Sequence, residues 1–299
     1  MQSQCRASLR IAWFIGAVVA SLVGLGIVPT TATVANAQTI RSGYLCCNAW
    51  AYDDWISDIN YRYEGSKLLR AGLPIRAVEE ARNSFKVMVG GKARWLGNDY
   101  SRSMPPDAFL RRYIVKEDPR QAIETFDPFT QDAIRRLRVM PGMTKDQVGM
   151  AIGYPVANYT PSLKRRTWQY WLDRSSQVDI VFNKDQQVTV LRGEWAAVKR
   201  VAYLPPEKVI AAAQARLNEL LLDAGEVDGY YGPATRKAVL RFQEQVGLPR
   251  HGYLNAASLQ ALGINLDGTR EAQAQAQSPA LRPPLAGAQA PAPAQSAPQ

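Results

Sequence analysis

The chain has 299 residues, of which 46% are hydrophobic, and its formal net charge is +10 at pH 7. That length allows two or three small domains, and the hydrophobic content is enough to give them folded cores. A charge this far from zero favours an acidic partner. Composition alone does not decide between nucleic acid, anionic lipid and an acidic polymer.

The first 37 residues have the pattern of a secretory signal peptide. Arg6 and Arg10 supply a positive head, residues 11–28 form an uncharged, mostly apolar run, and residues 35–37 read Ala-Asn-Ala, a small-x-small cleavage pattern. The alternative is an uncleaved anchor, because an apolar run of this length just spans a bilayer. Either interpretation places the remainder outside the cytoplasm, and we expect it in the periplasm. Nucleic acid is therefore excluded as a partner.

Two adjacent cysteines, Cys46 and Cys47, follow the signal peptide. In an oxidising compartment they are candidates for a vicinal disulfide or for pairing with another chain, and a redox-inert pair is the remaining alternative. Leu45 stands where a lipoprotein signal needs a small residue, so no lipid anchor is expected. The single histidine, His251, is distant in sequence, so we expect no zinc site, no other metal and no cofactor.

Residues 39–104 indicate a small, barrel-like β domain. Residues 75–78 and 85–89 alternate between apolar and polar side chains as strands do. Gly90 and Gly91 separate the second of these from residues 93–96, which predicts a hairpin. The segment resembles a bacterial barrel of the Src-homology type.

The next segment, residues 105–200, indicates an α+β domain. A helix is expected from Pro106 to residue 113, and a second over residues 128–139, with apolar side chains on one face. The second carries a basic cluster, for which the alternatives are a solvated helix face and contact with anionic lipid. The cluster consists of Arg135, Arg136 and Arg138.

A capping box predicts the start of a further helix. Thr144 stands three residues before Gln147, so each side chain can bond the other's backbone N–H. Gly153 and Pro155 then end the helix. Three alternating strands follow at residues 168–172, 178–182 and 188–190, which predicts a domain with the order ααβββ.

This domain resembles the SmpA/OmlA (BamE) family. The residues that carry the resemblance are 141–148 (Pro-Gly-Met-Thr-Lys-Asp-Gln-Val), 153–155 (Gly-Tyr-Pro), 168–171 (Trp-Gln-Tyr-Trp) and 181–185 (Val-Phe-Asn-Lys-Asp). The resemblance implies an outer-membrane accessory protein linked to β-barrel assembly and envelope integrity. The lipid-anchored cysteine of that family is absent from this sequence.

The C-terminal segment, residues 204–266, indicates three helices. Apolar residues recur at helical spacing after Pro206, at Val209, Ala213 and Leu217. Pro233 suits the first position of a second helix. Asn255 is a good N-cap for a short third one.

This segment resembles the type-1 family of three-helix peptidoglycan-binding modules. The residues that carry the resemblance are 214–217 (Gln-Ala-Arg-Leu), 227–233 (Val-Asp-Gly-Tyr-Tyr-Gly-Pro), 235–238 (Thr-Arg-Lys-Ala), 242–243 (Phe-Gln), 247–249 (Gly-Leu-Pro) and 252–262. The resemblance implies a three-helix bundle that binds the glycan and peptide of the cell wall.

Four residues near the start of the second helix are the candidate ligand contacts. Tyr230 and Tyr231 can stack on sugar rings, and Arg236 can pair with a peptide carboxylate. The helix N-terminus adds free N–H groups for an anionic or acetamido oxygen. Asp228 is the fourth candidate, with local turn hydrogen bonds as its alternative role.

No catalytic constellation is evident, so the predicted protein is a non-enzymatic peptidoglycan binder. A cysteine transpeptidase needs a Cys–His pair and a glycosidase needs two carboxylates in a cleft, and no spacing marks either set. The alternatives are an envelope assembly or integrity factor and, less favoured, a peptidoglycan-remodelling enzyme. Residues 267–299, rich in Pro, Ala and Gln, predict a disordered tail.

Overall fold

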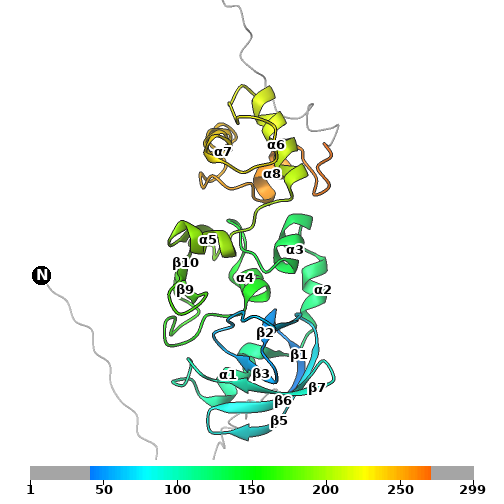
Figure 1. Cartoon of the computed structure of the whole chain (residues 1–299), viewed down its shortest axis with the longest axis vertical. Coiled ribbons are helices and arrows are strands. Elements are labelled where there is room, and N and C mark those ends of the chain that lie inside the picture. The colour runs from blue at the N-terminus through cyan, green and yellow to red at the C-terminus, as the bar shows by residue number, and fades with distance from the viewer. Residues whose placement is uncertain (1–40, 271–299) are drawn as a thin grey trace, which may run out of the picture. The chain divides into compact units, whose positions relative to one another are not determined.

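The structure is a computed structural model that describes residues 41–270 (Figure 1). The predicted signal peptide (1–37) and most of the predicted tail (267–299) lie outside the described residues. Within the described residues, no helix has both the length and the apolar character needed to cross a membrane.

The N-terminal region is a curled, six-stranded sheet with the strand order β3-β7-β6-β5-β1-β8 (Figure 1). The strands are β1 (Ser42–Leu45), β3 (Trp55–Ser57), β5 (Pro74–Ala81), β6 (Ser84–Val89), β7 (Lys92–Gly97) and β8 (Ile114–Val115). Two short strands, β2 (Ala49–Ala51) and β4 (Lys67–Leu69), pair separately. Because β3 and β8 are the edges of the sheet, the barrel-like β region that the sequence suggests is an open, curled sheet.

The predicted hairpin is confirmed. Strands β6 and β7 pair in antiparallel register from Ser84–Gly97 to Val89–Lys92. Gly90 and Gly91 connect them with φ of 55° and 77°, the left-handed conformation that a tight two-residue hairpin turn requires at both positions. Every second side chain of β6 is buried, as the alternation predicts.

Helix α1 (Pro106–Tyr113) belongs to the core of this sheet. Its side chains Phe109, Leu110 and Tyr113 are buried with those of β5–β7, and β8, which follows directly, pairs with β1. The sequence assigns this helix to the next domain, beginning at residue 105. The structure differs because the apolar face of α1 covers the sheet, which leaves the following domain to begin after β8.

The middle region has the predicted order of two helices and three antiparallel strands, with additions. Its elements are α2 (Pro119–Glu124), α3 (Pro128–Arg135), α4 (Lys145–Ile152), β9 (Thr167–Trp171), β10 (Gln177–Phe182), β11 (Val188–Arg192) and α5 (Trp195–Val201). Helices α2 and α5 were not predicted. Helix α3 ends at Arg135 and not at residue 139, because Leu137 adopts a left-handed conformation with φ of 57°.

The capping box at the start of α4 is confirmed. The backbone N–H of Gln147 donates to Thr144 Oγ1 at 3.3 Å, and the backbone N–H of Thr144 donates to Gln147 Oε1 at 2.8 Å. Two of the N–H groups that a helix start leaves free are thereby satisfied.

The C-terminal region is helical and contains α6 (Glu207–Glu219), α7 (Pro233–Gln245) and α8 (Ala256–Leu262). Asn255 caps α8, as predicted, by accepting from Ser258 N at 3.0 Å. Order continues further than predicted at the C-terminal side. Arg270 pairs with Glu219 at 2.7 Å, so residues 267–270 return to α6 instead of beginning a disordered tail.

The middle and C-terminal regions share one hydrophobic core. A single cluster of buried side chains runs from Phe129 in α3 through Tyr203 to Ile264. The side-chain amide of Asn255 donates to Pro141 O at 2.9 Å, which ties the start of α8 to the turn before α4. The two predicted domains are therefore packed against one another without a solvated linker.

The N-terminal sheet connects to the middle region through a buried asparagine. The Asn48 side chain donates to Ile134 O at 2.9 Å and to Ala151 O at 3.2 Å. The preceding residues, Cys46 and Cys47, are buried, and their sulfur atoms are bonded to each other in the structure. Adjacent cysteines so enclosed are inaccessible to another chain.

Candidate functional site

A loop of twelve residues before α7, residues 221–232, carries three of the predicted contact residues. A buried glutamine of α6 fixes its conformation. The amide nitrogen of Gln214 donates to Asp228 Oδ1 at 2.8 Å and to Tyr230 O at 3.1 Å, and its oxygen accepts from Gly229 N at 2.9 Å. Because the glutamine is 2% exposed, these bonds are shielded from competing water.

Asp228 has a local role in this loop. Besides the bond from Gln214, its Oδ1 accepts from Tyr230 N at 2.8 Å, which closes an Asx turn. The bond from Gln214 and then the one from the backbone lower the pKa of Asp228, which favours the charged form. The carboxylate is therefore occupied in shaping the loop, the alternative role that the sequence leaves open for it.

Tyr230 is the exposed aromatic residue of the loop. Its side chain is 67% exposed, and its ring lies over Gly232, where an added Cβ would come within 3.3 Å of the ring carbons. Gly232 is also the N-cap of α7, and no side chain caps that helix start. The exposed ring and the uncapped N–H groups of α7 thus lie beside each other.

Unlike Tyr230, the side chain of Tyr231 points into the protein. Its ring packs on the hydrophobic core, and its hydroxyl donates to Gly252 O. Burial raises the pKa of this phenol well above its usual value. Tyr231 therefore pins the loop before α7 to the loop before α8 and presents little ring surface for stacking.

Arg236 lies one turn into α7 and is exposed. Its side chain crosses Gly252, where an added Cβ would meet Arg236 Cγ at 3.1 Å and Nε at 3.2 Å. The positive φ of Gly252, 69°, also excludes most other residues there. Arg236 and Tyr231 thus converge on Gly252, while Tyr230 lies over Gly232 at the start of the same helix.

A second buried glutamine, which sequence reasoning did not assign to the site, fixes the loop before α8. Gln243 is fully buried in α7, and its amide oxygen accepts from His251 N at 3.0 Å and Gly252 N at 2.9 Å. Its amide nitrogen donates to Tyr253 O at 3.0 Å. Glutamines at inward helical positions are the signal that could have identified both loop anchors.

His251 is held in the same network as a neutral imidazole. Its Nδ1 accepts from Tyr253 N at 3.0 Å, and burial lowers its pKa to about 4.

Burial has the opposite effect on the carboxyl group of Asp58 in the N-terminal region, where it raises the pKa to about 6. Within residues 41–270, no group of three or more His, Cys, Asp or Glu side chains is placed to hold a metal ion.

Together, these side chains form a surface to which a ligand can bind. It offers an exposed aromatic ring, one guanidinium and the N–H groups of an uncapped helix start. That combination suits a ligand with sugar rings and carboxylate or acetamido oxygens.

Comparison with known proteins supports the same conclusion for this part of the chain. Residues 207–262, which comprise α6, α7 and α8, match the model of a family described as a peptidoglycan binding domain. No curated protein and no solved structure matches the chain.

Proposed function

Because residues 207–262 form a peptidoglycan-binding domain, we propose that the protein is an exported component of the cell envelope that attaches to peptidoglycan without cleaving it. The match supports the peptidoglycan partner. Export is supported by the positive head, apolar run and Ala-Asn-Ala pattern of the first 37 residues. The C-terminal domain is proposed to be a three-helix bundle of the type-1 family.

In this proposal, Tyr230 and Arg236 are the wall contacts. The ring of Tyr230 stacks on a sugar of the glycan, and the guanidinium of Arg236 pairs with a carboxylate of the peptide. Asp228 and Tyr231 act indirectly. The hydrogen bonds of Asp228 stabilise the conformation of the loop, and the hydrogen bond of Tyr231 connects the loop to Gly252. The fixed loops reduce the conformational entropy lost on binding.

The bonding of the cysteines, the histidine and the buried carboxyl group of Asp58 supports the non-catalytic assignment. Cys46 and Cys47 are bonded to each other, so neither is a free thiolate. His251 is buried and hydrogen-bonded, and Asp58 accepts from the backbone N–H groups of Asp99 and Tyr100, at 3.2 and 3.1 Å. Incubation of the full chain with purified sacculi is expected to release no soluble muropeptides. Their release would contradict the assignment.

The wall contacts can be tested by co-sedimentation of full-length variants with purified sacculi. Tyr230→Ala and Arg236→Ala are each expected to weaken binding by about 5- to 30-fold, the effect of losing a binding residue worth 1–2 kcal/mol. Both side chains are exposed, so neither change should lower the melting temperature. Added salt should weaken binding of the wild type more than that of Arg236→Ala, because salt screens the guanidinium–carboxylate pair.

Matched controls remove the same groups elsewhere. Tyr52 is exposed to a comparable degree, at 49%, and Arg165 is exposed with no ion pair among the described residues. Tyr52→Ala and Arg165→Ala should leave sedimentation unchanged. If the control variants lose as much binding as the test variants, attraction by overall charge or hydrophobicity explains attachment, and the assigned contacts are wrong.

A second candidate function is that of an envelope assembly or integrity factor acting through the middle region. The observation that favours it is the order of α3, α4 and β9–β11 together with the capping box of Thr144, as the SmpA/OmlA resemblance implies. Affinity capture from envelope extracts discriminates the two functions. Under the first function, partners that the wild type captures through wall fragments are lost with Tyr230→Ala and Arg236→Ala. Under the second, these partners persist in both variants.

A further inference from the structure

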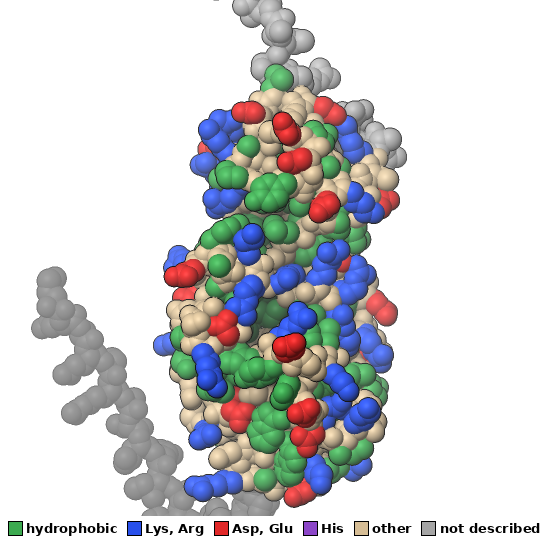
Figure 2. All heavy atoms as spheres, in the orientation of Figure 1, with side chains coloured by type: hydrophobic (Ala, Val, Ile, Leu, Met, Phe, Trp, Pro, Cys, Tyr) green, Lys and Arg blue, Asp and Glu red, His purple; other side chains and the backbone are tan. Residues whose placement is uncertain are grey.

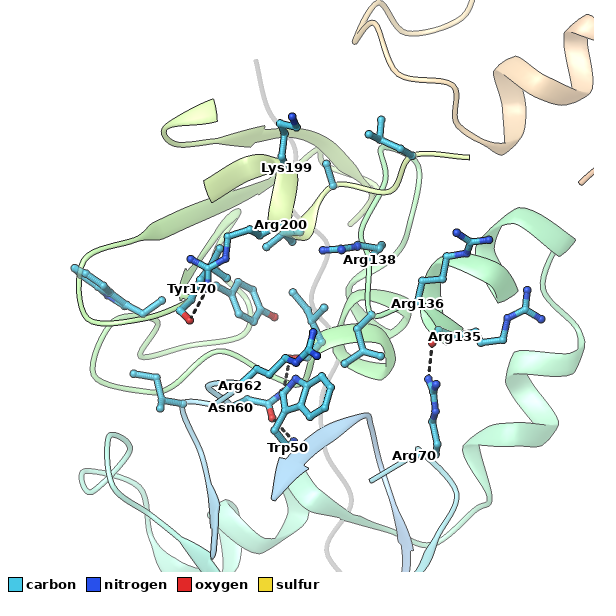
Figure 3. A pocket seen from close by; sticks show the side chains of 18 residues that line it. Trp50, Asn60, Arg62, Arg70, Arg135, Arg136, Arg138, Tyr170, Lys199 and Arg200 are labelled. Carbon is cyan, nitrogen blue, oxygen red and sulfur yellow. Dashed lines mark hydrogen bonds between the residues drawn. The ribbon is translucent and has the colours of Figure 1, made fainter. Parts of the chain in front are cut away.

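A pocket of 680 Å³ lies between the N-terminal sheet and the middle region, and none of its lining residues falls within residues 207–262 (Figure 3). Its walls come from β2, the loop after β3, the segment after α3, and β9 and α5. The volume is in the range of small-molecule sites, about 300–1,000 Å³. Figure 2 shows Lys and Arg side chains gathered around a hollow in this part of the surface.

The lining is strongly basic. Seven of the lining residues are Lys or Arg, and none is Asp or Glu. Carboxylates outside the lining neutralise part of this charge: Asp132 pairs with Arg135 and Arg136, and Asp173 pairs with Arg200. Four cations remain without an ion pair among the described residues. They are Arg62, Arg70, Arg138 and Lys199.

Two of these unpaired cations converge. Figure 3 shows Arg62 and Arg138 pointing into the middle of the pocket, while Arg135 and Arg136 point outward. Arg62 lies over the Trp50 ring, 5.0 Å from its centre, which fixes its direction. Arg138 is partly buried, and its pKa is lowered by desolvation and by the charges of Arg62 and Arg136.

The backbone holds Arg138 in this position. Leu137 has a φ of 57°, a conformation that costs a non-glycine residue about 1–2 kcal/mol. It turns the chain after α3, so that Arg138 N bonds to Ala133 O at 2.8 Å and Val139 N to Val201 O at 2.8 Å. The protein thus keeps two like charges together with no carboxylate between them, an arrangement that an anion would stabilise.

We propose that this pocket binds a phosphate-bearing ligand between Arg62 and Arg138. Guanidinium groups match the geometry of phosphate oxygens with paired N–H donors. A concave pocket favours a discrete phosphorylated group over an extended polyanion, which would need a groove open at both ends. This inference is independent of peptidoglycan binding, because none of its residues lies in residues 207–262.

Calorimetry with the full chain and inorganic pyrophosphate tests the proposal. The wild type should bind, and Arg62→Gln/Arg138→Gln should bind about tenfold or more weakly, the loss expected for two charge-assisted contacts. Arg111→Gln/Arg165→Gln removes the same charge from exposed positions outside the pocket and should leave binding unchanged. Equal binding by both double variants would overturn the proposal, as would failure of the wild type to bind both pyrophosphate and the vesicles described below.

The melting temperature provides a check on folding. Arg138→Gln removes one of two repelling cations, so its melting temperature should equal or exceed that of the wild type. If Arg138 were needed for folding, the same replacement would lower the melting temperature.

Vesicles of phosphatidylcholine, with and without phosphatidylglycerol, distinguish the source of the phosphate. If the wild type binds only to the vesicles that contain phosphatidylglycerol, and Arg62→Gln/Arg138→Gln does not, the phosphate belongs to a lipid headgroup. Pyrophosphate binding without vesicle retention assigns it to a soluble ligand.

Discussion

Gln214 and Gln243 determine the geometry of the loops that border α7. A glutamine buried in an apolar core is unfavourable unless its amide is hydrogen-bonded, and each of these bonds to the backbone of a neighbouring loop. The loop conformation is therefore linked to the stability of the core. These loops and α7 present Tyr230, whose ring lies over Gly232, and Arg236, whose side chain crosses Gly252.

The titration of His251 gives a direct test of this network. Because burial disfavours the charged imidazole, its NMR signals should titrate with a midpoint near pH 4 and not near 6.5. The chain's single histidine makes the assignment unambiguous. In Gln243→Ala, which loosens the loop, the midpoint should move up toward 6.5. A wild-type midpoint near 6.5 would show that the imidazole is solvated.

The lowered pKa of His251 also has a consequence for stability. The unfolded chain binds a proton on this histidine more readily than the folded one. Protonation therefore costs the folded protein nothing above pH 6.5, and the free energy of unfolding decreases as the pH falls from 6.5 toward 4. Between pH 7 and 5 the loss is about 2 kcal/mol. The raised pKa of Asp58 acts with the opposite sign, since the folded protein gains its proton first as the pH falls through 6.

At the scale of single elements, the capping box of α4 supports a helix of only eight residues. Thr144→Ala should lower the free energy of unfolding by about 1 kcal/mol, because it leaves the N–H of Gln147 without its acceptor. Thr144→Ser keeps that oxygen and should recover most of the loss. Urea denaturation of the three proteins measures both effects. Equal stability of the alanine and serine variants would contradict a capping role.

Elements with strong local signals could be predicted from the sequence, and elements fixed by tertiary contacts could not. The Gly90–Gly91 hairpin and the Thr144 cap need only a few neighbouring residues, and both were confirmed. The short helix α5 depends on burial of Ala197, Val198 and Val201 against β10 and the shared core, which no local pattern indicates.

The site could be predicted in part for the same reason. Tyr230 and Arg236 were predicted as contacts from residue type and position, and the structure shows that both are exposed. Their contact with a ligand stays a prediction. The inward turn of Tyr231 depends on Gly252, 21 positions along the chain, so its hydrogen bond is not visible in local sequence. The basic pocket combines Arg62 with Arg138, which are likewise distant in sequence, and the sequence indicated only the cluster after α3.

At the scale of the molecule, the shared core makes the middle and C-terminal regions interdependent. Asn255 contributes twice, as the cap of α8 and as the donor to Pro141 O. Asn255→Ala should lower the free energy of unfolding by about 2–3 kcal/mol through loss of a cap and a buried hydrogen bond. Differential scanning calorimetry should show one transition for both regions, shifted as a whole.

A control separates the two contributions of Asn255. Asn255→Ser keeps an oxygen that can cap α8 but cannot reach as the amide does toward Pro141 O, so it should lie between the wild type and the alanine variant. If Asn255→Ala instead lowers a separate transition of the C-terminal region and leaves the middle region unaffected, the two regions unfold independently.

The buried imidazole of His251 also determines how the protein responds to an acidic environment. Lysine and arginine keep their charge below pH 8, and the chain has no other histidine to gain one. Apart from the chain ends and the enclosed carboxyl of Asp58, the charge that faces an anionic cell wall is therefore nearly constant from pH 8 to 5. Mild acidification from pH 8 to 5 should therefore neither release the protein from purified sacculi nor tighten its hold.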